Sequence, residues 1–267
     1  MILLKARRML PAACLVALAV CGCDRARGRA SHRPAPAVNA EAGYTAPPAA
    51  SASAVVSGGR VEILGEAPPG AKVRLASPNG QALFADADTG GIWRIVVPPA
   101  AEVRLFGLSA PVAGRIVQAE GYLALAPGGR LVQLRAGSGA QCLRPLAPGL
   151  ALLAADFDRK GVVVLSGRAA PGAQVAIAVD GRAKGSALAQ ADGRFMVAFN
   201  EPLAPGAHVL AASVGGARAE EPLDVAPAAT LAPGPFRAER ADNGWRIDWL
   251  TPGGGVQSTV IYDRRAA

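Results

Sequence analysis

Histidine and cysteine are scarce in this chain of 267 residues, and their scarcity limits the chemistry available to it. The two histidines are His32 and His208, so several imidazoles cannot meet on one metal ion within a single chain. Three of the four cysteines lie among the first 23 residues, which leaves Cys142 alone in the later sequence. Because no histidine is near Cys142 in the sequence, we expect it to pack as a small apolar side chain and not to act as a nucleophile.

Sequence motifs of catalysis are missing as well. The chain has no Gly-x-Ser-x-Gly, Walker-type or dinucleotide-binding glycine motif. Two acidic stretches, residues 86–90 and 156–161, suggest calcium loops, but an EF-hand needs Glu at its twelfth position, where this chain has Val97 and Gly167. We therefore expect no catalytic residues, no cofactor and no metal site. A pair of carboxylates that meets only in the folded chain leaves a hydrolase as an alternative.

Aromatic residues are few, at 4% of the chain, whereas glycine (32 residues) and proline (22 residues) are frequent. This balance favours short strands joined by many turns over long helices. The formal net charge is +8, but the basic residues do not form a stripe interleaved with aromatic residues, as they do on nucleic-acid surfaces. We expect no nucleic-acid partner.

The N-terminal residues have the layout of an export signal. Lys5, Arg7 and Arg8 precede an apolar run, residues 9–20, that is too short to span a bilayer. This combination is typical of a targeting segment that is removed from the mature protein.

The end of that segment resembles the processing site of bacterial lipoproteins. Gly22 provides the small residue before Cys23, although Cys21 departs from the usual Ala, Ser or Thr. The resemblance implies that residues 1–22 are a signal peptide and that Cys23 is the lipid-attachment residue. The protein would then be exported and anchored to a bacterial membrane, facing the periplasm, and no internal disulfide could form. An ordinary secretory signal that contains cysteines is the alternative.

Composition divides the rest of the chain. Residues 23–54 are rich in Ala, Pro, Arg and Ser without apolar periodicity, so we expect a disordered tether. The remaining length suits two small domains, residues 55–150 and residues 151–267.

An internal repeat supports this division. Identical or similar residues recur 102 positions apart without a gap from residue 61 to residue 93. The matching pairs are Val61/Val163, Gly65/Gly167, Ala67/Ala169, Pro69/Pro171, Gly70/Gly172, Ala71/Ala173, Val73/Val175, Ala85/Ala187, Gly91/Gly193 and Trp93/Phe195. The segment Leu-Ala-Pro-Gly-Ala-His at residues 203–208 has no counterpart in the first copy, so we expect a shorter or altered loop there.

Each copy contains the pattern of strand, turn and strand. Pro69-Gly70 and Pro171-Gly172 predict type II turns, because Pro presets φ and Gly supplies a positive φ. Asn79-Gly80 and Asp180-Gly181 predict two-residue hairpins with primed turns. Residues 122–126 and 131–135 predict a further hairpin that extends the first domain.

The arrangement Gly-x-Ala-x-Pro-Gly-Ala-x-Val, followed by Gly-Gly-x-Trp or Asp-Gly-x-Phe, resembles the immunoglobulin-like repeats of exported bacterial proteins. The resemblance covers residues 60–110 and 162–226 and implies two tandem β-sandwiches that act as a scaffold or binding module, without catalytic residues. We therefore predict an all-β fold of two immunoglobulin-like domains.

The C-terminal hairpin holds two of the three tryptophans. Period-two alternation places Trp245, Ile247 and Trp249 on one face, with Arg246 and Asp248 on the other. One interpretation buries the tryptophan face in the core of the second domain. The other makes Trp245 and Trp249 an exposed aromatic platform for a glycan or peptide.

These observations predict a membrane-anchored lipoprotein of the cell envelope that acts as a structural or protein-binding module. The expected partners are the membrane, through the lipid anchor, and an envelope protein or glycan. The alternative function is recognition of glycan or peptidoglycan through Trp245 and Trp249.

Overall fold

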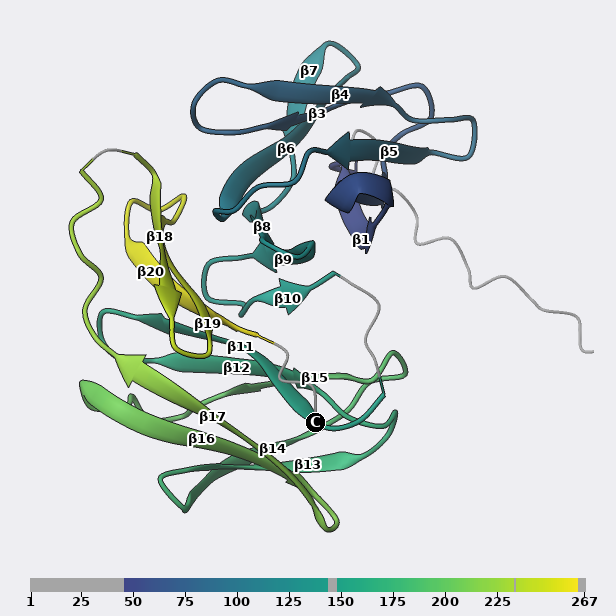
Figure 1. The fold of residues 1–267 in the computed structure, drawn as a ribbon. Helices are drawn as coiled ribbons and strands as arrows, with labels where there is room; N and C mark the ends of the chain where they lie inside the picture. Colours follow the sequence, from purple (N-terminus) through teal and green to yellow (C-terminus); the bar gives the residue numbers. More distant parts are fainter. Residues whose placement is uncertain (1–45, 144–147, 233, 264–267) are drawn as a thin grey trace, which may run out of the picture. The chain divides into compact units, whose positions relative to one another are not determined.

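The computed structural model describes residues 46–143, 148–232 and 234–263 and shows an all-β protein (Figure 1). These residues form twenty strands, arranged in four antiparallel sheets, and one short 3₁₀ turn at Ser57–Gly59. The predicted fold class, a pair of β-sandwiches, is confirmed.

The first sandwich packs a three-stranded sheet on a seven-stranded sheet. The smaller sheet has the order β1 (Ala49–Val55), β2 (Val61–Glu66), β5 (Ile92–Val97). The larger has the order β10 (Gln141–Cys142), β9 (Arg130–Leu134), β8 (Tyr122–Ala126), β6 (Arg104–Val112), β3 (Lys72–Ala76), β4 (Ala82–Asp86), and β7 (Arg115–Gln118) also pairs with β6. Alternating apolar residues of both sheets, including Ile63, Val73 and Trp93, form the core between them.

The second sandwich packs a six-stranded sheet on a four-stranded sheet. The larger sheet has the order β15 (Arg194–Ala198), β12 (Val163–Arg168), β11 (Ala151–Asp158), β20 (Val256–Tyr262), β19 (Gly244–Leu250), β18 (Phe236–Ala241). The smaller has the order β14 (Arg182–Leu188), β13 (Gln174–Val179), β16 (Gly206–Val214), β17 (Ala217–Val225). In Figure 1, β13, β14, β16 and β17 form a layer beside β11, β12 and β15. Phe157, Leu165 and Ile177 belong to the core that these two sheets enclose.

The repeat extends further than the sequence indicates. The 102-residue spacing also relates β1 to β11 and β6 to β16, whose bounds Arg104–Val112 and Gly206–Val214 match residue for residue. Even an irregularity recurs, because the register shift between Ala50 and Ala52 in β1 has its equivalent between Leu152 and Ala154 in β11. The two copies therefore share register as well as strand order.

The expected tether is too long. Strand β1 begins at Ala49, inside the segment 23–54 that composition assigns to disorder, and it pairs with β2 along its whole length. Its Ala- and Ser-rich sequence has little intrinsic strand preference. The strand forms because its neighbours supply the contacts: Ser53 donates its backbone N–H to the Leu143 carbonyl and its hydroxyl to the Gly129 carbonyl.

The predicted type II turns are confirmed. Gly70 and Gly172 have φ of 72° and 74°, and the N–H of the residue after each glycine bonds to the carbonyl three positions back, at Pro68 and Ala170. The primed turn at Asp180-Gly181 is also confirmed, since both residues have positive φ. At Asn79-Gly80 the prediction is wrong: Gly80 has positive φ and Asn79 does not. There, Ser77 N–H bonds to Gln81 and Gly80 N–H bonds to Ser77, giving a three-residue loop with glycine in the left-handed position.

The loop before β6 contains no deletion. β5 and β15 begin at equivalent positions, as do β6 and β16, so no residue is deleted in the first copy; its loop, residues 98–103, is one residue shorter than residues 199–205 only because β5 ends one residue later than β15. The copies diverge after β7 instead: β17 pairs with β16 along its length, whereas in the first copy β7 and then β8 pair with β6. The predicted hairpin of β8 and β9 is present and widens the first sandwich.

A third apolar cluster joins the two sandwiches. It contains Val103, Leu105, Ala124, Ala126, Val132, Leu134 and Ala140 from the first sandwich and Ala154, Trp245, Ile247, Trp249 and Ile261 from the second. The alternation predicted for the C-terminal hairpin is therefore correct, but its tryptophan face packs against β8 and β9, and not into the core of the second sandwich. Trp249 is completely buried, and its ring meets Tyr122 edge-on at 5.9 Å between centroids.

Candidate functional site

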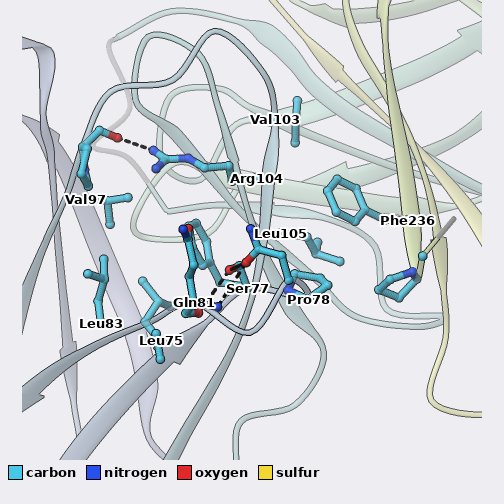
Figure 2. Close-up of a pocket in the computed structure, with 16 residues that line it drawn as sticks. Leu75, Ser77, Pro78, Gln81, Leu83, Val97, Val103, Arg104, Leu105 and Phe236 are labelled. Atoms are coloured by element: carbon cyan, nitrogen blue, oxygen red, sulfur yellow. Dashed lines mark hydrogen bonds between the residues drawn. The ribbon is translucent and has the colours of Figure 1, made fainter.

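A half-open pocket of about 730 Å³ lies between the first sandwich and the start of β18 (Figure 2). Its apolar wall includes Leu75, Leu83 and Val97, and its opposite side is formed by Pro235 and Phe236. This volume is in the range of about 300–1,000 Å³ usual for ligand sites. The pocket is therefore the candidate site of this protein.

The β3–β4 turn forms the polar rim of the pocket. Ser77, Asn79 and Gln81 line it, and Asn79 Oδ1 accepts bonds from the Ser77 hydroxyl at 2.5 Å and the Gln81 N–H at 3.2 Å. These bonds fix the turn because an Asn side chain can replace a backbone acceptor. The rim thus offers amide groups close to an apolar wall.

Arg104 carries the positive charge of the pocket. It lies on β6, where its guanidinium donates to the Pro98 carbonyl and stands 5.7 Å from the centre of the Phe106 ring. Figure 2 shows Arg104 on one side of the pocket and Phe236 on the other. Arg104 Nε is buried and has no hydrogen-bond partner. Burial lowers the pKa of this guanidinium from its usual value, and within the described part of the chain no carboxylate pairs with it.

Strands at the edges of two sheets flank the pocket. β4 is the last strand of the seven-stranded sheet and contributes Ala82 and Leu83, while β18 is the last strand of the six-stranded sheet and contributes Phe236. In both sheets the described residues leave the outer edge of these strands without a partner strand. Such edges present unpaired N–H and C=O groups.

The predicted site residues lie elsewhere. Cys23 is outside the described residues. Trp245 and Trp249 are 8% and 0% exposed, so they form no exposed platform. Because the first sandwich covers their face, they act as packing residues of the junction. Cys142 is buried, as expected of a small apolar side chain, and its carbonyl accepts bonds from Arg194 at 2.9 and 3.2 Å.

The two acidic stretches form turns. Asp88 Oδ1 accepts the N–H groups of Gly90 and Ile92, and Asp158 Oδ1 accepts those of Lys160 and Val162. These carboxylates are occupied by their own loops. Among the described residues, no three His, Cys, Asp or Glu side chains gather into a group suited to a metal ion.

Asp156 has a different place, at the junction of the two sandwiches. Its carboxylate accepts the Ala140 N–H and the Thr259 hydroxyl, and Thr259 Oγ1 in turn accepts Trp249 Nε1–H at 3.0 Å. Burial raises the pKa of the Asp156 carboxyl to about 7, although these two hydrogen bonds act in the opposite direction.

His208 braces a turn. Its Nδ1 lies 2.7 Å from Asp180 Oδ2, and its Nε2 lies 2.8 Å from the Ala204 carbonyl. The hydrogen bond to Asp180, followed by the one to Ala204, raises the pKa of the His208 imidazole. The same Asp180 accepts the Val209 N–H, so the pair braces the Asp180-Gly181 turn.

Sequence reasoning missed the pocket. Its lining comes from four separated segments of the chain, residues 75–83, 97–98, 103–106 and 234–236, and neither Arg104 nor Phe236 belongs to a motif. The one available signal was the Pro-Gly-Pro run at residues 233–235 ahead of a strand, which indicates a turn but not a cavity.

Comparisons with known proteins give no family. No family model matches the chain, and no curated protein matches it. Solved structures that align with it include a biofilm-associated protein's BSP domain (14% identity, TM-score 0.25, 70% of this chain and 30% of that one). Others are the central fibronectin-III array of RIM-binding protein (11%, 0.26, 81% and 89%) and a tetra-tandem repeat from the extending region of a large adhesion protein (14%, 0.24, 80% and 63%). The chain thus spans about a third of the length of the first of these.

In the part of the chain that the structure describes, no helix has the length and apolar character needed to cross a bilayer.

Proposed function

We propose that this protein is a protein-binding module of the bacterial cell envelope, anchored to a membrane through lipid on Cys23. The observation that carries the binding role is the pocket beside β4, in which an apolar wall, an amide-bearing rim and the Arg104 guanidinium, which has no carboxylate partner among the described residues, meet. A wall of this kind gains free energy by covering apolar surface, and the polar groups fix the orientation of what binds. The N-terminal sequence supports the anchoring.

A site-specific crosslink tests the binding role. A photo-crosslinking amino acid at Gln81, on the pocket rim, should capture an envelope protein in intact cells. The same amino acid at Ile116, an exposed residue on β7 outside the pocket lining, serves as the control. Replacing Ala82 with Trp, in the protein that carries the photo-crosslinking amino acid at position 81, should fill the pocket and remove the crosslink. Equal products from both positions, or products with polysaccharide alone, would contradict a protein-binding pocket.

Mass spectrometry of the mature N-terminus tests the anchor. We expect a peptide that begins at Cys23 and carries acyl chains, and membrane fractionation that is lost on Cys23→Ala. An unmodified N-terminus, or cleavage at another residue, would remove the lipoprotein proposal while leaving the pocket proposal intact.

The residues that the alternative function assigns to glycan recognition are not exposed. Trp245 and Trp249 are buried against the first sandwich, so a sugar could reach them only if the junction opened.

A further inference from the structure

We propose that the pocket binds an extended peptide segment that adds a strand to β4 and places an acidic group on Arg104. This inference rests on the proposed protein-binding function and names the chemistry of the partner. Its parts are the free edge of β4, the unpaired charge of Arg104 and the amide rim.

The hydrogen-bond pattern identifies which groups of β4 are free. Ser77 N–H bonds to the Gln81 carbonyl, and Ala87 N–H bonds to the Ala71 carbonyl. Because bonded and non-bonded pairs alternate along an antiparallel ladder, and because Leu83 lies opposite Leu75, the residues bonded to β3 are Leu83 and Ala85. Ala82, Phe84 and Asp86 therefore direct their N–H and C=O groups to the outer edge, where a peptide strand can pair with them.

The exposed face of β4 adds an apolar contact. Phe84 is 55% exposed although most large apolar side chains of the first sandwich are buried. It stands at the same edge whose backbone groups are free. A strand added there would cover part of its ring, while alternate side chains of the peptide would enter the pocket against Leu75 and Leu83.

Arg104 specifies the charge of the ligand. Its guanidinium is partly withdrawn from water, its Nε lacks an acceptor, and the described residues supply no carboxylate to it. A buried donor without an acceptor is costly, and a charged acceptor gives the strongest replacement. A carboxylate of the peptide, either a Glu or Asp side chain or a C-terminus, would supply to the guanidinium the counter-charge that the described residues do not provide.

The rim favours a peptide over a lipid chain. The amides of Asn79 and Gln81 line the pocket with the apolar residues. A hydrocarbon chain would bury such groups without a partner, whereas a peptide backbone offers a donor and an acceptor at every residue. A lipid is therefore treated as a competing outcome of the test.

The probes are an array of immobilised hexapeptides built from Leu, Val, Ile, Phe and Thr, each made with Glu and with Gln at its third position, and each with a free or amidated C-terminus. The full chain is applied in lipid nanodiscs, with empty nanodiscs as background. We expect the peptides with Glu or with a free C-terminus to bind about tenfold more tightly than the matched peptides with Gln or with an amidated C-terminus. Arg104→Gln should erase that difference, Arg104→Lys should keep part of it, and Arg115→Gln, an exposed charge on β7, should leave it unchanged.

The strand-addition part has its own pair of variants. Phe84→Pro removes one outward N–H without touching the β3–β4 ladder and should abolish binding, whereas Phe84→Ala keeps the N–H and should weaken it less. Hydrogen exchange on the wild-type protein provides a readout that does not depend on the folding of a variant. The amides of Ala82, Phe84 and Asp86 should become protected when a binding peptide is added.

The outcomes separate the two proposals. If no peptide binds and β4 gains no protection, the pocket is not a protein-binding site and the proposed function fails with it. If Glu and Gln peptides bind equally and Arg104→Gln changes nothing, the assignment of an acidic ligand is overturned while the proposed function stands. If dodecanoate protects the pocket and no peptide does, the ligand is a lipid and the inference is overturned.

Discussion

One buried residue at the junction, Asp156, makes the stability of the junction depend on pH. Asp156 is buried where β11 meets the loop before β10, and its carboxylate connects Ala140 of the first sandwich with Thr259 and, through it, Trp249 of the second. A buried carboxyl favours its neutral form. Above neutral pH, the junction therefore contains an ionised Asp156 carboxylate in surroundings that favour the neutral form.

The free energy of unfolding should fall between pH 4 and pH 7. Because the folded state raises the pKa of Asp156 to about 7 from an unfolded value near 4, the folded state holds more protons in this interval, and stability decreases as pH rises. Urea unfolding at several pH values measures this, with Asp156→Asn as the variant that should flatten the dependence. A wild-type protein and variant with parallel pH profiles would show that Asp156 does not titrate in this range.

Substitutions at two glycines should separate the stability cost of backbone strain from the stability cost of steric overlap. Gly172 has φ of 74° and open space around its missing Cβ, so Gly172→Val should cost about 1–3 kcal/mol of strain. A Cβ on Gly167 would stand 2.2 Å from the Phe195 ring and 2.6 Å from the Ala151 carbonyl oxygen. Since the backbone carbonyl cannot move aside cheaply, Gly167→Ala should destabilise more, despite its smaller side chain. Chemical denaturation of both variants measures the order, and the reverse order would contradict it.

At the scale of elements, the C-terminal hairpin contributes four of the five residues of the second sandwich in the cluster that joins it to the first. β19 and β20 extend the six-stranded sheet and turn Trp245, Ile247 and Trp249 toward β8 and β9. The hairpin thus completes one sandwich and covers the other.

Trp249→Ala should cost about 3–5 kcal/mol, because the ring is fully buried and its Nε1–H bond to Thr259 is lost. Leu250→Ala, on the next residue but 38% exposed, is the matched control and should cost far less. Truncation after Pro235 should expose both the β11 edge and the apolar face of β8 and β9, giving aggregation. A truncated protein that melts like the intact one would refute this role.

Local patterns predicted the strands well because each depends on neighbours in the sequence. The bounds of β5, β13 and β20 follow from alternation and flanking turns, and Gly70 and Gly172 from the Pro-Gly pairs. β1 was missed because Ala and Ser carry no strand signal and its stability comes from β2 and Leu143. The pocket was missed because it also depends on contacts between residues that are distant in the sequence. Arg104 and Phe236 line one pocket only after the sheets have packed.

At the scale of the whole molecule, the two copies are bound together more tightly than tandem domains on a flexible linker. Twelve buried residues from both sandwiches form one cluster, and Asp156, Gln257 and Arg194 add hydrogen bonds to the backbone at Ala140, Gly137 and Cys142. Small interfaces between domains permit relative motion, whereas apolar ones of this kind resist it.

We therefore expect the two sandwiches to unfold in one transition. Hydrogen exchange in urea should give the same midpoint for β5 in the first core and β13 in the second. Leu134→Asp, a charge placed at the junction, should separate the two midpoints, while Val96→Asp, an exposed site on β5, should not. Two midpoints in the wild-type protein would mean that the copies fold independently.

The shared register of β1 and β11 creates a risk during folding. Both strands have the same length of pairing, the same bulge and equivalent partners, so a newly made chain offers β11 two similar grooves, one beside β12 and one beside β2. Exchange of such equivalent strands is a known failure of repeated domains. Only β11 carries Phe157 and Asp156 and has β20 as its second neighbour. Correct assembly of the second copy therefore depends on β20, which lies far downstream of β11 in the sequence, so the strand exchange cannot be fully resolved until β20 has been made.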